Sequence, residues 1–292
     1  MYCLSLLYIR EGEYGMSVEI IRSISKEEKK EKKLTKKQLT LLMLVYRFRF
    51  VNSKQIAQYF KQSYLSAANS QLTELYERGY LGKCHNSTYR IQGRAAEYYL
   101  TPKATPVLRK QLTEPSEREL KQSYARPTAS SRFISYSLAL FDIYLDLYRL
   151  YGDRFNFATK SQLNLERFEF FPHPLPEAFI TLDAETEKER HFFLEYFDDG
   201  VSVGIHSRKI VNYMKYKENG QWDDTGKEFP TVIIVCQYPA LLKRAEKRVR
   251  YLDRQAFSEI SFRLIDLESL KNLDSIKNKS WIDPIEQTKT IL

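Results

Sequence analysis

Six residues in the last third of the chain most constrain its fold. Thr231–Cys236 (Thr-Val-Ile-Ile-Val-Cys) form a continuous apolar run between two helical patterns, at 205–217 and 240–255. A strand that is apolar on both faces must be covered on both sides, which is typical of the interior of an α/β sheet. Further strands are predicted at 155–159, 168–171, 178–183, 191–197 and 261–266. We therefore expect a mixed-sheet α/β domain over residues 132–270, beginning with an aromatic-rich helix at 132–151.

Charge divides the chain into two parts. Residues 1–112 contain 20 Lys and Arg against 9 Asp and Glu, whereas 113–292 contain 26 against 28, so the net charge of +9 comes from the first part. A basic part joined to a nearly neutral one is typical of a protein that binds a polyanion through electrostatic attraction and counterion release. Many of these charges lie in a lysine-rich run at 26–37, for which a solvated helix is the alternative interpretation.

Residues 34–112 show the element order of a winged helix-turn-helix. Thr35 and Gln38 have the spacing of a capping box, and Asn52 or Ser53 can cap the next helix. The predicted elements are helices at 35–48, 54–60 and 65–78, a hairpin of 80–84 with 97–100, and a last helix from 102 to 112. Together they predict an α+β module ahead of the α/β domain.

The third predicted helix places small polar side chains opposite its apolar stripe, of which Leu65 and Tyr76 are the ends. Such a face can approach a major groove closely, where Asn69 and Gln71 can donate to and accept from base edges. The hairpin tip and nearby lysines suit phosphate or minor-groove contacts. The candidate DNA-binding residues are Lys36, Lys37, Ser66, Asn69, Ser70, Gln71, Thr73, Lys83, Asn86, Thr88, Arg90 and Arg94. A protein-docking module is the alternative, because winged helices also serve for docking and dimerisation.

The predicted helix at 240–255 forms a second basic region. A contact with a DNA backbone and ordinary exposed helix charge, supported by Glu246 within the run, are both compatible with this pattern. Its basic residues are Lys243, Arg244, Lys247, Arg248, Arg250 and Arg254.

The remaining segments differ in composition. We expect a basic, partly disordered segment at 1–33, a polar linker with two prolines at 113–131, and a C-terminal tail at 271–292. The apolar opening, Met1–Ile9, is too short to span a bilayer and lacks a cleavage site. With a mean hydropathy of -0.49 and three unclustered cysteines, a soluble protein of a reducing cytoplasm, with no membrane partner, is expected.

Several short segments occur in an order found in a known family. They are Leu34-Thr35 with Tyr46-Arg47-Phe48, Tyr98–Lys103, Leu175–Ala178, Phe192–Tyr196 and Phe229–Cys236. Their order and spacing over about residues 34–255 resemble the replication-relaxation family of bacterial plasmids and integrative elements. The resemblance implies a winged helix followed by a domain similar to the PD-D/ExK nuclease fold. It also implies an association with plasmid replication, DNA relaxation or conjugative mobilisation.

The resemblance also implies where a nuclease site would lie. In the nuclease fold, two acids on adjacent strands hold a divalent metal and a lysine two residues beyond the second acid orients water. Glu177 and Glu195 occupy the acidic positions, but Glu177 replaces the more usual Asp and Phe197 stands where the lysine is expected. Lys209 is a candidate migrated lysine, although solvated helix lysines are far commoner. We therefore expect a non-catalytic domain without a cofactor.

Three functions remain open. The first is a sequence-specific double-stranded-DNA-binding protein of a plasmid or integrative element, with a relaxase, a replication initiator protein or a second copy of the chain as candidate partners. The second is a metal-dependent endonuclease, or nickase, that uses Glu177 and Glu195 with Mg²⁺. The third is a protein-interaction adaptor or transcriptional regulator. Walker, serine-hydrolase and zinc-protease motifs do not occur in the sequence, so those enzyme classes are not indicated.

Overall fold

The computed structural model describes residues 33–85, 93–112, 120–121, 123–124, 129–163, 170–256, 259–277 and 279–292. The chain divides into two compact units, Met1–Leu39 and Thr40–Leu292. Helix α2 (Lys36–Phe48) begins in the first unit, at the predicted capping box, and its residues from Thr40 onward belong to the second unit. The Gln38 N–H donates to Thr35 Oγ1 (3.2 Å) and the Thr35 N–H donates to Gln38 Oε1 (3.0 Å). Except for Lys33, the predicted basic segment at 1–33 lies outside the described residues.

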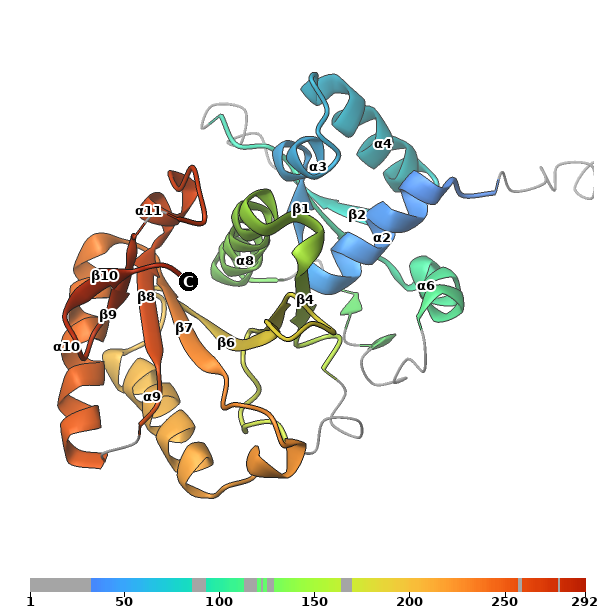
Figure 1. Ribbon diagram of the computed structural model, residues 1–292. Helices are drawn as coiled ribbons and strands as arrows, with labels where there is room; N and C mark the ends of the chain where they lie inside the picture. The colour runs from blue at the N-terminus through green and yellow to red at the C-terminus, as the bar shows by residue number, and fades with distance from the viewer. Residues whose placement is uncertain are drawn as a thin grey trace, which may run out of the picture. The chain divides into compact units, whose positions relative to one another are not determined.

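The second unit continues from α2 into two helices, α3 and α4 (Figure 1). It also contains a small antiparallel sheet of order β1-β3-β2. Asn52 caps α3 as predicted by accepting from the Gln55 N–H, and the Asn52 N–H donates to Gln55 Oε1, which completes a capping box. The predicted hairpin is present as β2 and β3, and β1 was not expected. The elements are β1 Val51–Asn52, α3 Ser53–Tyr59, α4 Leu65–Glu77, β2 Leu81–Cys84, β3 Glu97–Leu100, η1 Pro102–Ala104 and α6 Thr105–Gln111.

A seven-stranded sheet of order β10-β9-β8-β7-β6-β5-β4 follows. Its β6-β7 and β7-β8 pairs are parallel and the other pairs antiparallel, so the predicted mixed sheet is confirmed. The strands are β4 Phe155–Thr159, β5 Ala178–Leu182, β6 Arg190–Phe197, β7 Thr231–Cys236, β8 Phe262–Asp266, β9 Trp281–Asp283 and β10 Thr288–Thr290.

Two sequence expectations differ from this sheet. The strand predicted at 168–171 is not formed at its two described residues, Phe170 and Phe171, which lie in a turn. Phe171 instead packs edge-on against the ring of Phe193, and that contact explains its apolar character. The segment 271–292, expected to be a tail, contributes β9 and β10 to the sheet. Strands this short leave little periodicity in a sequence.

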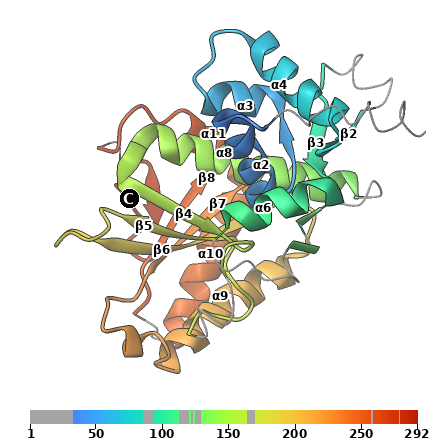
Figure 2. The same cartoon turned by 90° about the vertical axis from the view of Figure 1, so that its right-hand side faces the viewer.

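Helices cover both faces of the sheet. The rings of Tyr196 and Tyr136 on α8 are 5.1 Å apart, whereas Phe193 stacks on Tyr213 of α9 at 5.5 Å. Because residues an odd number of positions apart point to opposite faces of a strand, α8 and α9 cover opposite faces of β6. Figure 2 shows α8 above the strands and α9 below them. The helical elements are α8 Ser131–Tyr151, η2 Gly152–Arg154, α9 Val203–Glu218, η3 Asp223–Thr225, α10 Pro239–Ala256 and α11 Leu267–Lys271.

Within the second unit, the N-terminal helices share a core with α8 and β4. Phe48 stacks on Phe141 of α8 with ring centroids 4.4 Å apart. The buried Gln55 amide donates to Leu138 O (2.8 Å) and to Asp142 Oδ1 (2.7 Å). Leu120, inside the predicted linker, is fully buried. None of the described helices has the length and apolar composition needed to cross a membrane.

Candidate functional site

Strand register brings the two candidate glutamates together. Ala178 of β5 pairs with Leu194 of β6, and the Glu177 N–H donates to Leu194 O at 2.9 Å. Glu177, just before β5, is therefore the cross-strand neighbour of Glu195. Both side chains are buried, with exposed fractions of 6% and 2%. The two acidic positions implied by the family resemblance thus meet at one point of the sheet.

Two lysines and a tyrosine contact these carboxylates. Lys209 of α9 donates from Nζ to Glu177 Oε1 (2.9 Å) and to Glu195 Oε2 (2.5 Å). Lys160, which follows β4, donates to Glu177 Oε1 at 2.6 Å, and the Tyr213 hydroxyl donates to Glu195 Oε1 at 2.8 Å. We call these five residues the Glu–Lys cluster. Glu177, Glu195 and Lys209 were predicted from the sequence, whereas Lys160 and Tyr213 were not.

Burial and ion pairing set the charges in the Glu–Lys cluster. Burial opposes ionisation of Glu177, but Lys160 and Lys209 outweigh it and lower the Glu177 pKa to about 2. At Glu195, burial dominates and raises the pKa, with Lys209 opposing the shift. Burial also disfavours the Lys209 ammonium, yet the two carboxylates raise its pKa above the usual value. Lys209 is therefore a protonated bridge between two buried carboxyl groups.

A cavity of about 500 Å³ lies beside the Glu–Lys cluster. Glu177, Lys160 and Lys209 line it, together with Arg132 at the start of α8, but Glu195 does not. Arg132 is itself within 3.7 Å of Asp198, the residue that follows β6. A molecule in this cavity would meet the two ammonium groups, the Arg132 guanidinium and the carboxylates of Glu177 and Asp198, whereas Glu195 does not line the cavity.

The Glu–Lys cluster does not fit a divalent metal. Mg²⁺ takes carboxylate and water oxygens in an octahedral arrangement, and the position between Glu177 and Glu195 is taken by Lys209 Nζ. Among the described residues, no group of three His, Cys, Asp or Glu side chains could hold a metal ion. As arranged, the cluster can stabilise the sheet through paired charges.

The candidate DNA-binding residues of α4 lie mainly on its exposed face. Ser66, Asn69, Ser70 and Thr73 are exposed, whereas Gln71 is half-buried. The Gln71 Oε1 atom is buried, with no hydrogen-bond partner among the described residues. Gln71 therefore does not share the open face with Asn69.

Two apolar residues join this face although the sequence predicted otherwise. Leu65 and Tyr76 were expected in the buried stripe, but they are 41% and 46% exposed, and Tyr64 before the helix is 75% exposed. The stripe that packs inward is Ala68, Leu72 and Leu75. Helical spacing identifies an apolar stripe but does not say where along it the packing partner ends.

The remaining candidates are on the hairpin and in the first unit. Lys83 of β2 is exposed, and its ammonium lies 5.8 Å from the ring centroid of Tyr98. Arg94 forms an ion pair with Glu97 at 2.9 Å. Lys36 and Lys37, in the first turn of α2, are exposed. Three further candidates lie outside the described residues: Asn86, Thr88 and Arg90.

Residues 42–232 match the family described as Replication-relaxation. This chain belongs to the replication-relaxation family. The family match includes α4 and the whole Glu–Lys cluster, so both candidate regions lie inside the family's common sequence. No curated protein matches the chain.

Two solved structures are similar to parts of this replication-relaxation protein. The first is the C30AH42A mutant of ZitR from Lactococcus lactis, at 19% identity and a TM-score of 0.23, covering 37% of this chain and 73% of ZitR. The second is the restriction endonuclease FokI, at 11% identity and a TM-score of 0.30, covering 80% of this chain and 42% of FokI. The chain therefore spans less than half the length of FokI, and TM-scores this low do not establish a shared fold.

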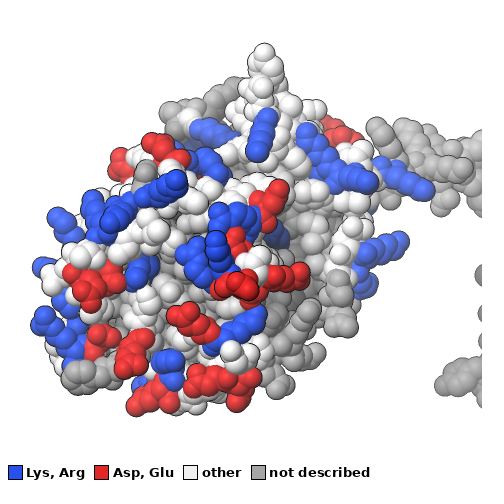
Figure 3. Space-filling model, in the orientation of Figure 1, with Lys and Arg blue, Asp and Glu red and all other residues white. Residues whose placement is uncertain are grey.

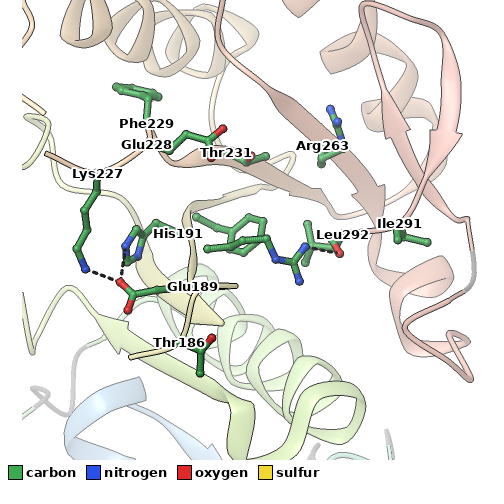
Figure 4. A pocket seen from close by; sticks show the side chains of 12 residues that line it. Thr186, Glu189, His191, Lys227, Glu228, Phe229, Thr231, Arg263, Ile291 and Leu292 are labelled. Atoms are coloured by element: carbon green, nitrogen blue, oxygen red, sulfur yellow. Dashed lines mark hydrogen bonds and ion pairs between the residues drawn. The ribbon is translucent and has the colours of Figure 1, made fainter. Parts of the chain in front are cut away.

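The replication-relaxation chain has a second cavity, of about 470 Å³, at the amino ends of β6 and β7 (Figure 4). Glu189 lies at its centre, forms an ion pair with Lys227 and lies 2.9 Å from His191 Nε2, whose pKa is lowered by burial. Arg190 donates to the backbone oxygen of Leu292 at 3.1 Å. No candidate residue from the sequence lies in this cavity, and its central charges are already paired.

Proposed function

We propose that this replication-relaxation protein binds duplex DNA through a winged helix formed by α2, β1, α3, α4, β2 and β3. Three helices and a three-stranded antiparallel sheet of order β1-β3-β2 support this assignment, with α4 as the recognition helix. The expected context is replication initiation or control, DNA relaxation or mobilisation of a plasmid or integrative element. The proposal involves no cofactor.

The exposed face of α4 is the main observation behind this proposal. Residues 64–73 contain no Asp or Glu, so the first turns of α4 present no acidic side chain to a phosphate backbone. Asn69 can form a bidentate contact with adenine, and Tyr64 and Leu65 can contact thymine methyl groups. Lys54 on α3 and Lys61 between α3 and α4 are exposed and suit contacts with backbone phosphates, which set position but not sequence preference.

We expect Asn69→Ala to weaken binding to the preferred duplex about tenfold, since one bidentate base contact contributes about 1–3 kcal/mol of discrimination. Fluorescence anisotropy on duplexes from the element's own non-coding DNA, against scrambled duplexes over a salt series, measures this. Wild-type protein should prefer its site by at least roughly a hundredfold. Asn156→Ala, the same change on an exposed position of β4, serves as the matched control.

Equal, salt-sensitive binding of both duplexes, unchanged by Asn69→Ala, would contradict sequence readout and favour the adaptor function.

In the proposed function, the α/β domain contacts protein: a relaxase, a replication initiator or a second copy of this chain. If two copies bind, their half-sites should be about one helical turn, or a multiple of it, apart.

The endonuclease is a second candidate because Glu177, Glu195 and Lys209 do meet beside a cavity. The bridging position of Lys209 opposes it, as does the burial of Glu195 behind Glu177. We therefore expect supercoiled plasmid to stay intact after long incubation with the protein and Mg²⁺, as followed on an agarose gel. Nicking that needs Mg²⁺ and disappears in Glu195→Gln would instead establish a nuclease.

A further inference from the structure

Helix α10 is a basic element in an otherwise acidic part of the chain. It contains six Lys and Arg and two acidic residues, Glu246 and Asp253. Residues 113–292 hold 26 basic and 28 acidic residues in all, so the part of this range outside α10 holds 20 basic and 26 acidic residues. In the space-filling view, Lys and Arg side chains line the left edge over α10 (Figure 3). This concentration of positive charge is not explained by the composition of the domain.

Packing turns the basic side chains of α10 outward. One face of the helix is buried in the core of the sheet through Leu241, Leu242, Ala245, Val249 and Leu252. Lys243, Arg244, Lys247 and Arg254 are exposed on the remaining surface. Arg250 is already bound to Glu246 and to the Pro284 carbonyl, so Glu246 is neutralised within the helix and does not offset the exposed cations.

An aromatic ring lies among these cations. Tyr251 is 53% exposed, and the Arg248 guanidinium lies 5.3 Å from its ring centroid. Lys247, Tyr251 and Arg254 line a surface hollow of about 380 Å³. An exposed ring next to several Lys and Arg side chains offers both a stacking surface and phosphate contacts.

We propose that α10 binds single-stranded DNA, with an unpaired base stacked on Tyr251 and the backbone phosphates held by Lys243, Lys247 and Arg254. An unpaired strand suits this surface because its bases expose their faces, whereas the bases of a duplex are stacked on each other. The lysines are four residues apart, about 6 Å along the helix, so they form a row that an extended backbone can follow. This contact is separate from the proposed duplex contact of α4.

The test measures anisotropy of the full-length protein with a fluorescein-labelled oligothymidylate of about 16 nucleotides and with a duplex of the same length. Tyr251→Ala should lower affinity for the oligothymidylate about tenfold, because it removes the ring on which a base stacks, and leave duplex affinity unchanged. Tyr251→Phe should keep the wild-type affinity because it keeps the ring. The double variant Lys247→Gln with Arg254→Gln should reduce the salt slope, which is the slope of the logarithm of the binding constant against the logarithm of the salt concentration. The expected reduction on the oligothymidylate is about 1.4, or about 0.7 per charge removed.

Matched variants separate this proposal from the duplex proposal. Tyr64→Ala, an exposed tyrosine next to α4, should weaken duplex binding only. Lys110→Gln with Lys188→Gln removes two exposed cations elsewhere and should leave the salt slope on oligothymidylate unchanged. Wild-type affinity of Tyr251→Ala for the oligothymidylate would overturn the proposal, as would equal losses on the single strand and the duplex. Unchanged far-ultraviolet circular dichroism checks that each variant is folded.

Discussion

Replacing Lys209 with methionine should lower the free energy of unfolding by about 3–5 kcal/mol. The change keeps the length of the side chain but removes the ammonium that Glu177 and Glu195 share. Glu177 retains Lys160, whereas Glu195 retains only the Tyr213 hydroxyl among its contacts in the cluster. A buried carboxylate without a counter-charge is the cause of the expected loss. Urea denaturation followed by circular dichroism measures it.

Two companion variants identify the cause of that loss. Arg208→Met removes the neighbouring exposed cation on α9 and should change stability by no more than about 0.5 kcal/mol. Adding Glu195→Gln to Lys209→Met should recover much of the stability, because no unpaired charge is then buried. A loss in the double variant as large as in Lys209→Met alone would show that packing of the lysine stem, rather than its charge, is responsible.

The deficit of Lys209→Met should also depend on pH. Without the ammonium, burial raises the Glu195 pKa further, so protonation in mild acid neutralises the buried carboxylate and the deficit shrinks. In wild-type protein, the lowered Glu177 pKa of about 2 contributes stability above the unfolded-state pKa of about 4.3. That contribution is lost as pH falls toward 2. The two proteins should therefore converge in stability as the solution is acidified.

Phe48→Ala should be similarly costly, at about 3–5 kcal/mol, because it leaves a cavity in a fully packed aromatic cluster. Phe48 is 1% exposed, and its ring lies 4.4 Å from Phe141 and 6.1 Å from Phe157. These contacts join the end of α2 to α8 and β4. We therefore expect the variant to shift the unfolding transition of the seven-stranded sheet to a lower denaturant concentration. Fluorescence of the buried Trp222 and Trp281 reports this transition.

A partly exposed phenylalanine serves as the control for Phe48→Ala, because its replacement removes a ring of the same size from a less buried position. Phe133→Ala, at a side chain 45% exposed, should cost less than half as much. Two separate transitions, with the tryptophan transition of Phe48→Ala unchanged, would show that the N-terminal helices unfold independently of the sheet. A single shifted transition would show one cooperative core from Thr40 onward.

The sequence predicted those elements whose own residues determine them. The apolar run Thr231–Cys236 forms the central strand β7, and the caps at Thr35 and Asn52 begin their helices as expected. The three-residue strands β9 and β10 were missed because they depend on pairing at the edge of an existing sheet. Local sequence determines caps and long apolar runs, and tertiary pairing determines short edge strands.

The candidate site was predicted only in part for the same reason. Glu177 and Glu195 were identified by the family resemblance, and their meeting follows from the register of β5 and β6. Lys160 could not be foreseen, because nothing in its own segment indicates that the end of β4 lies beside Glu177. Leu65 was wrongly predicted to be buried. Periodicity shows to which side of the helix a side chain points, but not how far along the helix the packing partner extends.

The bridging ammonium of Lys209 has an evolutionary consequence. A metal centre between Glu177 and Glu195 would require that ammonium to leave, yet its loss weakens the folded state before any cation has bound. The route between this arrangement and a metal-loaded one therefore passes through a less stable intermediate sequence. A lineage could cross it only with stability in reserve or with a stabilising substitution already present elsewhere in the domain. Purifying selection should consequently act on these three positions together.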